Sequence, residues 1–415
     1  MRYVTREKVF SSHRYTVRPT GHSISMFTSI KEIFKKELDA IETAGLHKAE
    51  HILDSRQGRI VHADGREILN FCANNYLGLS GSDALIEAAK QGLDRYGFGL
   101  SSVRFICGTQ TIHKELEQET ARFLKKDDAV LYSSCMSANM GFFASFLTDQ
   151  DAILTDALNH ASLIDGIRLT KAERYIFKHM DVEDLERGLQ QMKEKRIRCV
   201  VTDGVFSMDG DIAPLKEIAA LTKKYDALFV VDDSHATGFV GKNGRGTPEH
   251  CGVEEEADVI TSTYGKALGG ASGGFIAGRK ELIDLLRERS RTYLFSNSLP
   301  PVVAAVSLFA LHYTQEHPEL REALWKNVEY FRQEMAKAGF ELPVSVHPIV
   351  PVMIGDAIKT KKMAAELFAQ GIYAVGFSYP VVPEGKARIR VQISAAHTKE
   401  DLDKAVIAFR HAAQS

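Results

Sequence analysis

Short apolar runs that end in polar residues recur through the middle of this 415-residue chain, and they limit its fold more than any other feature. Amphipathic segments, such as residues 182–195 and 215–225, separate several of these runs. Repeated alternation of strand and helix predicts an α/β fold with a mainly parallel sheet covered by helices on both faces. The predicted strands lie in DAVLYSSC, DAILTDALNH, RCVVTDGVFSMDG, ALFVVDDSHATG, ADVITSTYGK and GGFIAG.

The sequence divides into four predicted parts: a basic extension over residues 1–25, a helix and hairpin over 26–75, a large domain over 76–300 and a smaller α+β domain over 301–415. In the second part, apolar residues with helical spacing share one face, and Gly45 can end that helix. Asp64-Gly65 predicts the hairpin turn. The apolar residues of the helix are Ile30, Ile33, Phe34, Leu38 and Ile41. In the last part we expect a helical stretch over 302–338, strands in VHPIVPVMIG, IYAVGFSYP and ARIRVQIS, and a final helix from Lys399.

Composition excludes several classes of protein. Hydrophobic residues make up 44% and charged residues 26% of the chain, as in a globular domain. A net charge of -2 argues against binding to nucleic acid or to an anionic membrane surface. No apolar run approaches the roughly 20 residues that cross a bilayer. The five cysteines have no paired spacing, so we expect neither a disulfide framework nor a zinc site. This cysteine usage fits a protein of a reducing compartment.

The first 25 residues are basic and rich in Ser and Thr. Five cations stand against the single acid Glu7, which is typical of a mitochondrial transit peptide and not of a secretory signal. The cations are Arg2, Arg6, Lys8, Arg14 and Arg18. Two other interpretations stay open: a basic arm, or a start codon assigned ahead of Met26. The first interpretation predicts the mitochondrial matrix, and the others a cytoplasmic protein.

Polar residues follow the predicted strands at the sheet edge where open α/β folds bind ligands. Ser133, Ser134 and Cys135 come just before a predicted helix N-terminus, a ready anion site. The other polar residues at this edge are Asn159, His160, Asp203, Ser207, Asp209, Asp232, Asp233, His235, Ser262, Thr263 and Lys266.

Each of these residues alone has an ordinary interpretation. Asp232 and His235 resemble two metal ligands, but no third ligand stands at a suitable spacing, so we predict no metal site. Lys266 has no GxxxxGK[ST] context, which argues against a nucleotide-binding loop. His160 alone fits a structural histidine, and the glycines around Lys266 fit a tight turn.

Together the same residues fit the chemistry of pyridoxal phosphate (PLP). A lysine amine forms a Schiff base with the cofactor aldehyde, and a carboxylate keeps the pyridine nitrogen protonated. Lys266 lies among small residues that leave it room to move, and Asp232 stands thirty-four residues earlier, at the end of the preceding predicted strand. A helix N-terminus and hydroxyl groups suit the phosphate.

The predicted strand ARIRVQIS adds a candidate substrate ligand. Its apolar residues alternate with Arg388, Arg390 and Gln392, so both arginines lie on one face. An arginine there can hold a carboxylate with two hydrogen bonds, or it can be an ordinary solvated residue. The spacing does not choose between Arg388 and Arg390.

Long stretches of the chain, from about Met26 to the C-terminus, resemble the α-oxoamine synthases, fold-type I PLP enzymes that join an amino acid to an acyl-CoA. The matching stretches are NFCANNYLGLS, SSVRFICGTQ, HKELE, DALNHASLIDGIRL, TDGVFSMDGDIAPL, VDDSHATGFVG, GKALGGASGG, YLFSNSLPP and GFSYPVVPEGKARIRVQISAAH. The sequence differs from the family at Ser262 and Tyr264, beside the lysine, and at Met136. The resemblance implies that Met136 contacts the cofactor through its backbone, so its side chain matters less.

The resemblance implies a role for each matching residue. Lys266 carries the cofactor, Asp232 pairs with the pyridine nitrogen, and His160 stacks on the ring. His235 and Ser207 lie near the phenolic oxygen. The backbone of Cys135 and Met136 and the Thr263 hydroxyl hold the phosphate. Asn74 and Arg390 meet the substrate, with Arg390 on its carboxylate. Phe295 and Ser296 reach the site of a neighbouring subunit, which implies a homodimer with shared sites.

Within the family the sequence is most similar to the enzymes that interconvert glycine plus acetyl-CoA and 2-amino-3-oxobutanoate plus CoA. That resemblance implies a role in threonine degradation and a threonine dehydrogenase as a possible partner. The alternatives are sister enzymes that make 8-amino-7-oxononanoate, 5-aminolevulinate or sphingoid bases, a non-catalytic subunit of a heterodimer, or a plain binding protein. Intact Lys266, Asp232, His160 and His235 weigh against a non-catalytic subunit.

Overall fold

The computed structural model describes residues 28–43, 47 and 50–414. The chain divides into two compact units, Met1–His51 and Ile52–Ser415. The basic extension over residues 1–25 and the predicted helix stop at Gly45 lie outside the described residues. Within the described ranges, no helix combines the length and the apolar composition needed to cross a membrane.

The first unit contains helix α1 (Thr28–Thr43), as the spacing of its apolar residues predicts. These side chains are solvent-exposed, with exposed fractions between 41% and 62%. The helix is therefore amphipathic, and its apolar face is open to solvent.

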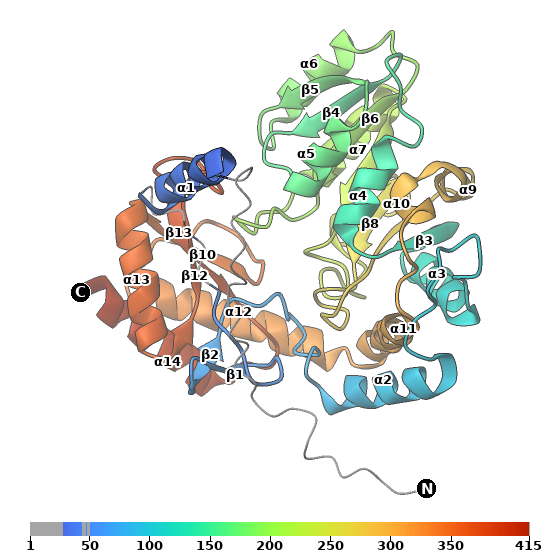
Figure 1. Cartoon of the computed structure of the whole chain (residues 1–415). Coiled ribbons are helices and arrows are strands. Elements are labelled where there is room, and N and C mark those ends of the chain that lie inside the picture. Colours follow the sequence, from blue (N-terminus) through green and yellow to red (C-terminus); the bar gives the residue numbers. More distant parts are fainter. Residues whose placement is uncertain (1–27, 44–46, 48–49, 415) are drawn as a thin grey trace, which may run out of the picture. The chain divides into compact units, whose positions relative to one another are not determined.

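A seven-stranded sheet forms the centre of the second unit (Figure 1), in the order β3-β9-β8-β7-β6-β4-β5. The pairs among β8, β7, β6, β4 and β5 are parallel, whereas β9 runs antiparallel to both of its neighbours. The predicted mainly parallel sheet is confirmed. The strands are β3 (Asp128–Tyr132), β4 (Ala152–Asp156), β5 (Glu173–Phe177), β6 (Arg198–Asp203), β7 (Leu228–Asp232), β8 (Val259–Thr263) and β9 (Gly274–Gly278).

Helices cover both faces of this sheet, because successive side chains of each buried strand point to opposite sides. One face packs on α4 (Cys135–Phe143), α5 (Ala161–Arg168) and α9 (Lys280–Arg289). The other packs on α3 (Thr111–Phe123), α6 (Val182–Gln191), α7 (Leu215–Lys224) and α11 (Pro301–Glu316). The remaining helices of this part are α2 (Asp83–Tyr96), α8 (Thr247–Cys251) and α10 (Arg291–Leu294).

Two small sheets lie in the rest of the unit. One joins the hairpin β1 (Ile60–Ala63) and β2 (Arg66–Asn70) to β11 (Ile372–Tyr373), and the other is β10-β13-β12. The hairpin turns at Asp64-Gly65, as predicted, with both residues at positive φ. The other elements are β10 (Ile349–Gly355), β12 (Val375–Phe377), β13 (Ala387–Gln392), α12 (Glu319–Lys337), α13 (Ala357–Ala369) and α14 (Lys399–Gln414).

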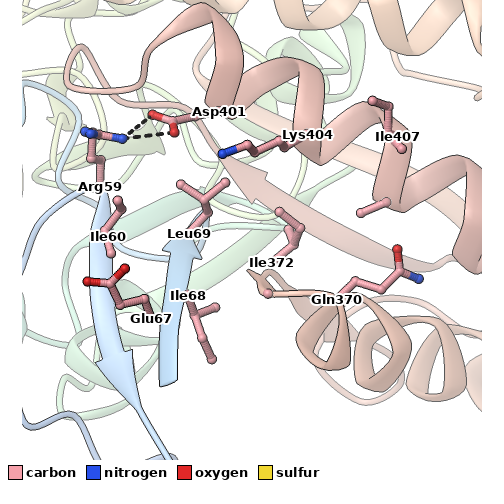
Figure 2. A pocket seen from close by; sticks show the side chains of 12 residues that line it. Arg59, Ile60, Glu67, Ile68, Leu69, Gln370, Ile372, Asp401, Lys404 and Ile407 are labelled. Atoms are coloured by element: carbon pink, nitrogen blue, oxygen red, sulfur yellow. Dashed lines mark hydrogen bonds and ion pairs between the residues drawn. The ribbon is translucent and has the colours of Figure 1, made fainter. Parts of the chain in front are cut away.

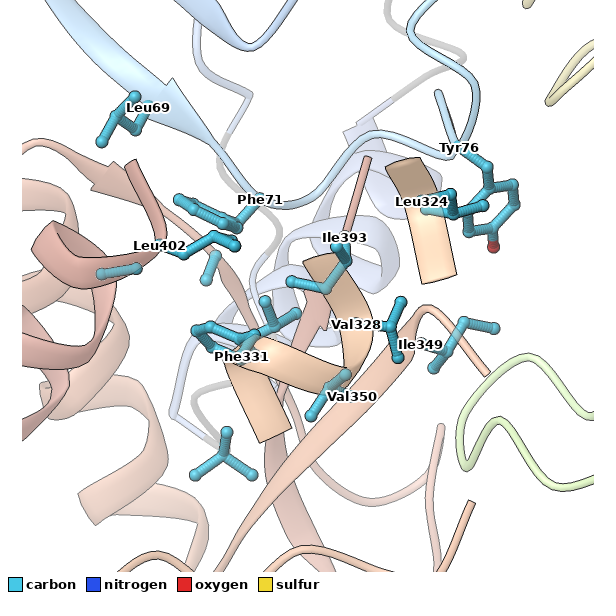
Figure 3. Close-up of a cluster of buried hydrophobic side chains, with 14 of the residues drawn as sticks. Leu69, Phe71, Tyr76, Leu324, Val328, Phe331, Ile349, Val350, Ile393 and Leu402 are labelled. Carbon is cyan, nitrogen blue, oxygen red and sulfur yellow. The ribbon is translucent and has the colours of Figure 1, made fainter. Parts of the chain in front are cut away.

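A continuous apolar core joins α12, α14 and the small sheets to the segment that follows β2 (Figure 3). Phe71 and Tyr76 from this segment are fully buried, Phe71 with its ring centre 6.3 Å from that of Phe331 of α12 and Tyr76 beside Leu324 of the same helix. The core thereby fixes residues 71–76 against the seven-stranded part, since Tyr76 also packs on Phe239.

Two sequence predictions need correction. The predicted strands did not include β5, because its side chains are mostly exposed and it lacks an apolar run. The single helical stretch over 302–338 is two helices, α11 and α12, with a break at His317. His317 precedes Pro318, which excludes it from helical backbone angles. The predicted domain boundaries remain a prediction.

Candidate active site

A cavity of about 210 Å³ lies at the carboxyl ends of the central strands. It brings together most of the site residues that the sequence predicts, from four strand ends and the start of α4. Its lining consists of Cys135, Met136, His160, Ser162, Asp203, Val205, Asp232, Ser234, His235, Thr263 and Lys266.

The carboxylate of Asp232 is buried and held in one orientation. Asn139 Nδ2 donates to its Oδ2 over 2.6 Å, and the backbone N–H of Ser234 donates to its Oδ1 over 3.0 Å. A carboxylate held in this way is in a fixed position to accept a hydrogen bond from a group bound in the cavity.

Asp203 lies beside Asp232, because the two residues are paired in the register of β6 and β7. Burial, together with the neighbouring Asp232, raises the pKa of Asp203 well above its ordinary value. The backbone N–H of His160 donates to Asp203 Oδ2 over 3.0 Å. A neutral Asp203 avoids placing two adjacent negative charges at this edge.

Lys266 lies in the loop between β8 and β9. Three of its glycines, Gly269, Gly270 and Gly273, have positive φ, and the loop closes on itself through the Tyr264 N–H to Gly273 carbonyl bond of 3.0 Å. Burial lowers the pKa of Lys266 below its ordinary value, although Asp232 opposes the shift. A lower pKa makes the neutral, nucleophilic amine more available.

The two differences from the family beside Lys266 point away from the cavity. The Ser262 hydroxyl donates to Thr237 Oγ1 over 2.9 Å, and the Tyr264 hydroxyl lies 2.5 Å from Thr120 Oγ1 of α3. Both side chains are buried, and neither lines the cavity.

The N-terminus of α4 opens into the cavity at Cys135 and Met136. The N–H groups of the first helical turn have no carbonyl partner within the helix, so they attract an anion. Gly274 of β9 packs directly against this turn, since a Cβ there would lie 2.2 Å from the Cys135 nitrogen. The Thr263 hydroxyl stands at the adjacent strand end and donates to the Gly273 carbonyl over 2.9 Å.

Two histidines line the cavity. His160 is the N-cap of α5, with its Nδ1 2.7 Å from the Ser162 hydroxyl. His235 Nδ1 lies 2.8 Å from the Tyr76 hydroxyl, and the His235 carbonyl accepts from His347 Nε2 over 2.7 Å. Burial and nearby Lys266 lower the pKa of His235 well below its usual range, which keeps its imidazole neutral.

Asn74, Arg388 and Arg390, which the sequence also predicts as candidates, lie beside the cavity but do not line it. The Arg390 guanidinium donates to the Ser207 carbonyl over 2.9 Å and lies 4.8 Å from the centre of the Phe377 ring. Asn74 Oδ1 accepts from Gln392 Nε2 over 2.8 Å. The other candidate arginine, Arg388, is only 2% exposed and forms an ion pair with Asp209, so its guanidinium is not available to a substrate carboxylate.

Phe295 and Ser296 are not part of this cavity. Phe295 is 66% exposed and its ring lies 5.1 Å from the Arg291 guanidinium, while the Ser296 hydroxyl donates to the Asn297 carbonyl over 3.4 Å.

The residues of the cavity fit PLP. A buried lysine with a lowered pKa suits its aldehyde, the fixed Asp232 carboxylate suits a protonated pyridine nitrogen, and the α4 turn with Thr263 suits its phosphate. Among the described residues, no group of three or more His, Cys, Asp or Glu side chains is arranged to hold a metal ion.

A larger cavity, of about 510 Å³, lies between the β1–β2 hairpin and α14 (Figure 2). Its main charged pair, Arg59 and Asp401, is joined by two hydrogen bonds of 2.9 and 2.8 Å. Apolar side chains make up much of the rest, including Ile60, Leu69 and Ile372. Size alone therefore does not identify the active site.

Three residues that support the site were not predicted from the sequence. Asn139 orients Asp232, Tyr76 bonds His235, and His347 bonds the His235 carbonyl. Tyr76 belongs to the matching stretch NFCANNYLGLS, which was a signal for it. Asn139 lies one helical turn after Cys135, on the side of α4 that faces Asp232. No pattern in the sequence pointed to His347.

Comparison with known proteins agrees with this geometry. Residues 66–409 match the aminotransferase class I and II family. The chain belongs to this family. Within it, the chain is an α-oxoamine synthase: it is 55% identical to the 2-amino-3-ketobutyrate coenzyme A ligase of Escherichia coli K12, over 91% of this chain and 96% of the relative. It is 52% identical to the human mitochondrial 2-amino-3-ketobutyrate coenzyme A ligase, over 93% of this chain and 92% of the relative.

A solved structure gives the same result for the fold. SPT (serine palmitoyltransferase) with a PLP internal aldimine superposes with a TM-score of 0.87 at 30% identity, over 95% of this chain and 99% of that one. The predicted fold-type I architecture and the predicted family are both confirmed.

Proposed function

We propose that this α-oxoamine synthase is a PLP-dependent glycine C-acetyltransferase, which interconverts glycine plus acetyl-CoA and 2-amino-3-oxobutanoate plus CoA. The observation that carries the proposal is the meeting of Lys266 and Asp232 in one cavity with an anion-binding helix N-terminus. The 2-amino-3-ketobutyrate coenzyme A ligases that the chain resembles over more than 90% of its length support the choice of substrates.

The cavity residues hold the cofactor through three contacts. Lys266 would bond to its aldehyde carbon, Asp232 would pair with its pyridine nitrogen, and the N–H groups of Cys135 and Met136 with the Thr263 hydroxyl would hold its phosphate. His160 would stack on the ring, and neutral His235, bonded to Tyr76, would serve its phenolic oxygen together with Ser207.

Arg390 and Asn74 hold the amino acid substrate. Arg390 is oriented by the Ser207 carbonyl, and its remaining N–H groups bind the glycine carboxylate. Burial lowers the pKa of Arg390, but an arginine keeps its charge at neutral pH, so the carboxylate meets a full positive charge.

PLP, when bound, supplies an electron-withdrawing ring that stabilises negative charge on the substrate α-carbon. The amine of Lys266 would take the α-proton of glycine as general base, because its lowered pKa favours the neutral, proton-accepting form. The α-carbon then forms a bond to the acetyl carbonyl, the thioester bond breaks, and CoA leaves as its thiolate. The buried walls around Asp203, Asp232 and His235 limit access of water to the reacting atoms.

The enzyme works as a homodimer in which each site takes Phe295 and Ser296 from the neighbouring subunit. Support comes from a group of large apolar side chains that are open to solvent in the single chain, as expected of a surface that a second copy covers. These are Phe98, Phe105, Ile106 and Phe295, with exposed fractions between 62% and 81%.

The location and metabolic setting follow from the relatives and from the chemistry. The human relative is a mitochondrial protein, and the basic residues before Met26 are consistent with the same location here. Because 2-amino-3-oxobutanoate is the oxidation product of threonine at its β-carbon, a threonine dehydrogenase is the natural supplier of the substrate for cleavage.

Absorption spectra of the purified protein test the proposal. We expect the visible band of a lysine-linked pyridoxal, a shift of this band on addition of glycine, and release of CoA on addition of acetyl-CoA. A colourless protein that does not take up PLP would refute the cofactor and the function. A band that responds to glycine, with CoA release only from longer acyl-CoA thioesters, would assign a sister activity.

A further inference from the structure

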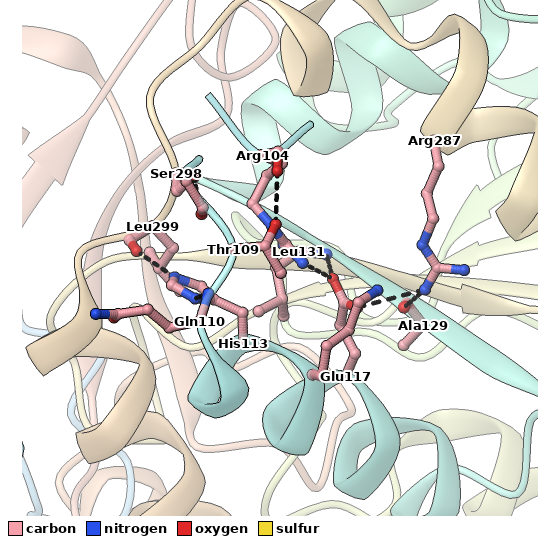
Figure 4. Close-up of polar contacts among 12 residues, drawn as sticks. Arg104, Thr109, Gln110, His113, Glu117, Ala129, Leu131, Arg287, Ser298 and Leu299 are labelled. Carbon is pink, nitrogen blue, oxygen red and sulfur yellow. Dashed lines mark hydrogen bonds and ion pairs between the residues drawn. The ribbon is translucent and has the colours of Figure 1, made fainter. Parts of the chain in front are cut away.

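A buried polar cluster on α3, to which the proposed function assigns no role, joins two surface segments (Figure 4). Its members are Arg104, His113, Glu117, Arg287 and the segment 298–299. Three of the stretches that resemble the family, SSVRFICGTQ, HKELE and YLFSNSLPP, meet here although they are far apart in the sequence.

Glu117 is the centre of this cluster. Its side chain is 1% exposed, and three cations surround the carboxylate: Arg104 Nη2 at 2.8 Å, Lys114 Nζ at 2.7 Å and Arg287 Nη2 at 3.4 Å. The backbone N–H of Leu131 also donates to it, over 3.4 Å. Loss of this carboxylate is costly because the buried Arg104 would lose its counter-charge, whereas Arg287 would keep its ion pairs with Asp128 and Asp284.

The cluster fixes the loop over residues 102–109 from the inside. Arg104 Nε donates to the Thr109 hydroxyl over 3.0 Å, and that hydroxyl donates back to the Arg104 carbonyl over 2.7 Å. Gly108 has no room for a side chain, since a Cβ would lie 2.5 Å from the Val103 carbonyl oxygen. The loop is therefore a rigid turn, with Phe105 and Ile106 exposed at its tip.

The second segment, residues 295–299, is bonded to both the loop and α3. The backbone N–H of Ser298 donates to the Ser102 carbonyl over 3.2 Å, and the Ser298 hydroxyl donates to the Gly108 carbonyl over 2.5 Å. The His113 Nε2–H donates to the Leu299 carbonyl over 2.8 Å, and His113 Nδ1 accepts from the Gln110 N–H over 3.1 Å. One buried histidine thus caps α3 and holds the segment that carries Phe295 and Ser296.

We propose that Glu117 and His113 are positioning residues for the shared active site. They hold loop 102–109 and segment 295–299 as one unit on α3, and the unit presents Phe295 and Ser296 to a second copy of this chain. This inference rests on the dimer with shared sites given under the proposed function. Its particular consequence is that a defect at Glu117 damages the site of the neighbouring subunit and not the site of its own chain.

Mixed dimers test this consequence. The variant Glu117→Gln keeps the size of the side chain and removes its charge, and its homodimer should lose about tenfold in kcat/KM and in affinity for PLP. Paired with a Lys266→Ala chain, it should recover about half of the wild-type turnover per dimer, because one site then combines an intact Lys266 with an intact partner segment. Two different affinity tags on co-expressed chains allow the mixed dimer to be purified.

Two outcomes would overturn the inference: a Glu117→Gln homodimer with wild-type activity, or a mixed dimer that stays as inactive as that homodimer. Glu115→Gln, an exposed neighbour on α3, is the matched control and should leave the activity unchanged. If Glu117→Gln does not fold, His113→Asn takes its place, since its Oδ1 can still accept from Gln110 while the bond to Leu299 is lost.

A second mixture separates this inference from the proposed shared site. Phe295→Ala/Ser296→Ala chains paired with Lys266→Ala chains should also recover turnover. If they do and the Glu117→Gln mixture does not, the positioning role is wrong while the shared site stands. If they do not, the shared site is wrong, and this inference falls with it.

Discussion

The Tyr76 hydroxyl lies 2.8 Å from Nδ1 of His235, and both side chains are buried. Tyr76 comes from the segment after β2, whereas His235 follows β7, so the bond ties the N-terminal part of the unit to the candidate site. We predict that Tyr76→Phe lowers kcat about three- to tenfold, because the imidazole loses the partner that fixes its ring. Steady-state CoA release measures this. Tyr313→Phe, in α11 and outside the cavity lining, is the control; an equal loss in both variants would contradict the specific role of Tyr76.

Lys266→Ala should lower turnover by about a thousandfold or more, since it removes both the covalent contact to the cofactor and the general base. Cofactor held by Asp232 and the α4 N-terminus should stay bound without the lysine-linked absorption band. Absorbance and a CoA-release assay on the same sample give both quantities. Substantial turnover in this variant would exclude Lys266 from the chemistry.

Gly274→Ala should damage the proposed phosphate site at the N-terminus of α4. The added Cβ would lie 2.2 Å from the Cys135 nitrogen and 2.3 Å from the Ser134 carbonyl carbon, and these are backbone atoms that cannot move aside. We expect a loss of about 2–3 kcal/mol in the free energy of unfolding and a weaker affinity for PLP. Urea unfolding and cofactor titration measure the two effects. Gly58→Ala is the matched control, because its Cβ would lie 3.6 Å from the nearest atom. Wild-type PLP affinity in Gly274→Ala would contradict this prediction, because it would mean that the backbone at Ser134 and Cys135 can make room for the added Cβ without harm to cofactor binding.

His179 should make stability depend on pH. Although burial opposes its charge, hydrogen bonds to Asp156 and Asp211 raise the pKa of His179 from 6.5 to about 10. A folded-state pKa above the unfolded one means that the stabilisation is complete below about pH 6.5 and is lost as the pH rises toward 10. His179→Gln should therefore cost about 1–2 kcal/mol at pH 6 and only a few tenths near pH 10. Urea unfolding of both proteins at the two pH values measures this, and a cost that does not change with pH would refute the charged bridge.

Six of the seven strands of the large sheet were predictable from the sequence because they are buried on both faces and read as apolar runs, whereas β5 is mostly exposed and was not predicted. Candidate site residues were predictable where these runs end. Asp232 ends β7, Lys266 follows β8 and His160 follows β4, and parallel strands bring their carboxyl ends to one edge.

Other parts of the site depend on contacts between distant segments. Asn139 and His347 reach Asp232 and His235 only after α4 and the segment before β10 have packed. The choice between Arg388 and Arg390 was also invisible to strand periodicity, because both lie on the same face of β13. It depends on the position of Asp209, which pairs with Arg388.

The residues that would hold the cofactor and those that would hold the substrate come from different sheets. Lys266 and Asp232 extend from the seven-stranded sheet, while Arg390 belongs to the three-stranded sheet β10-β13-β12. Natural selection can therefore alter the second sheet and its loops, and with them the choice of amino acid or acyl donor, while the first keeps its chemistry intact. An architecture of this kind lets one ancestral catalyst diversify into enzymes with different substrates by changes in only one of its two halves.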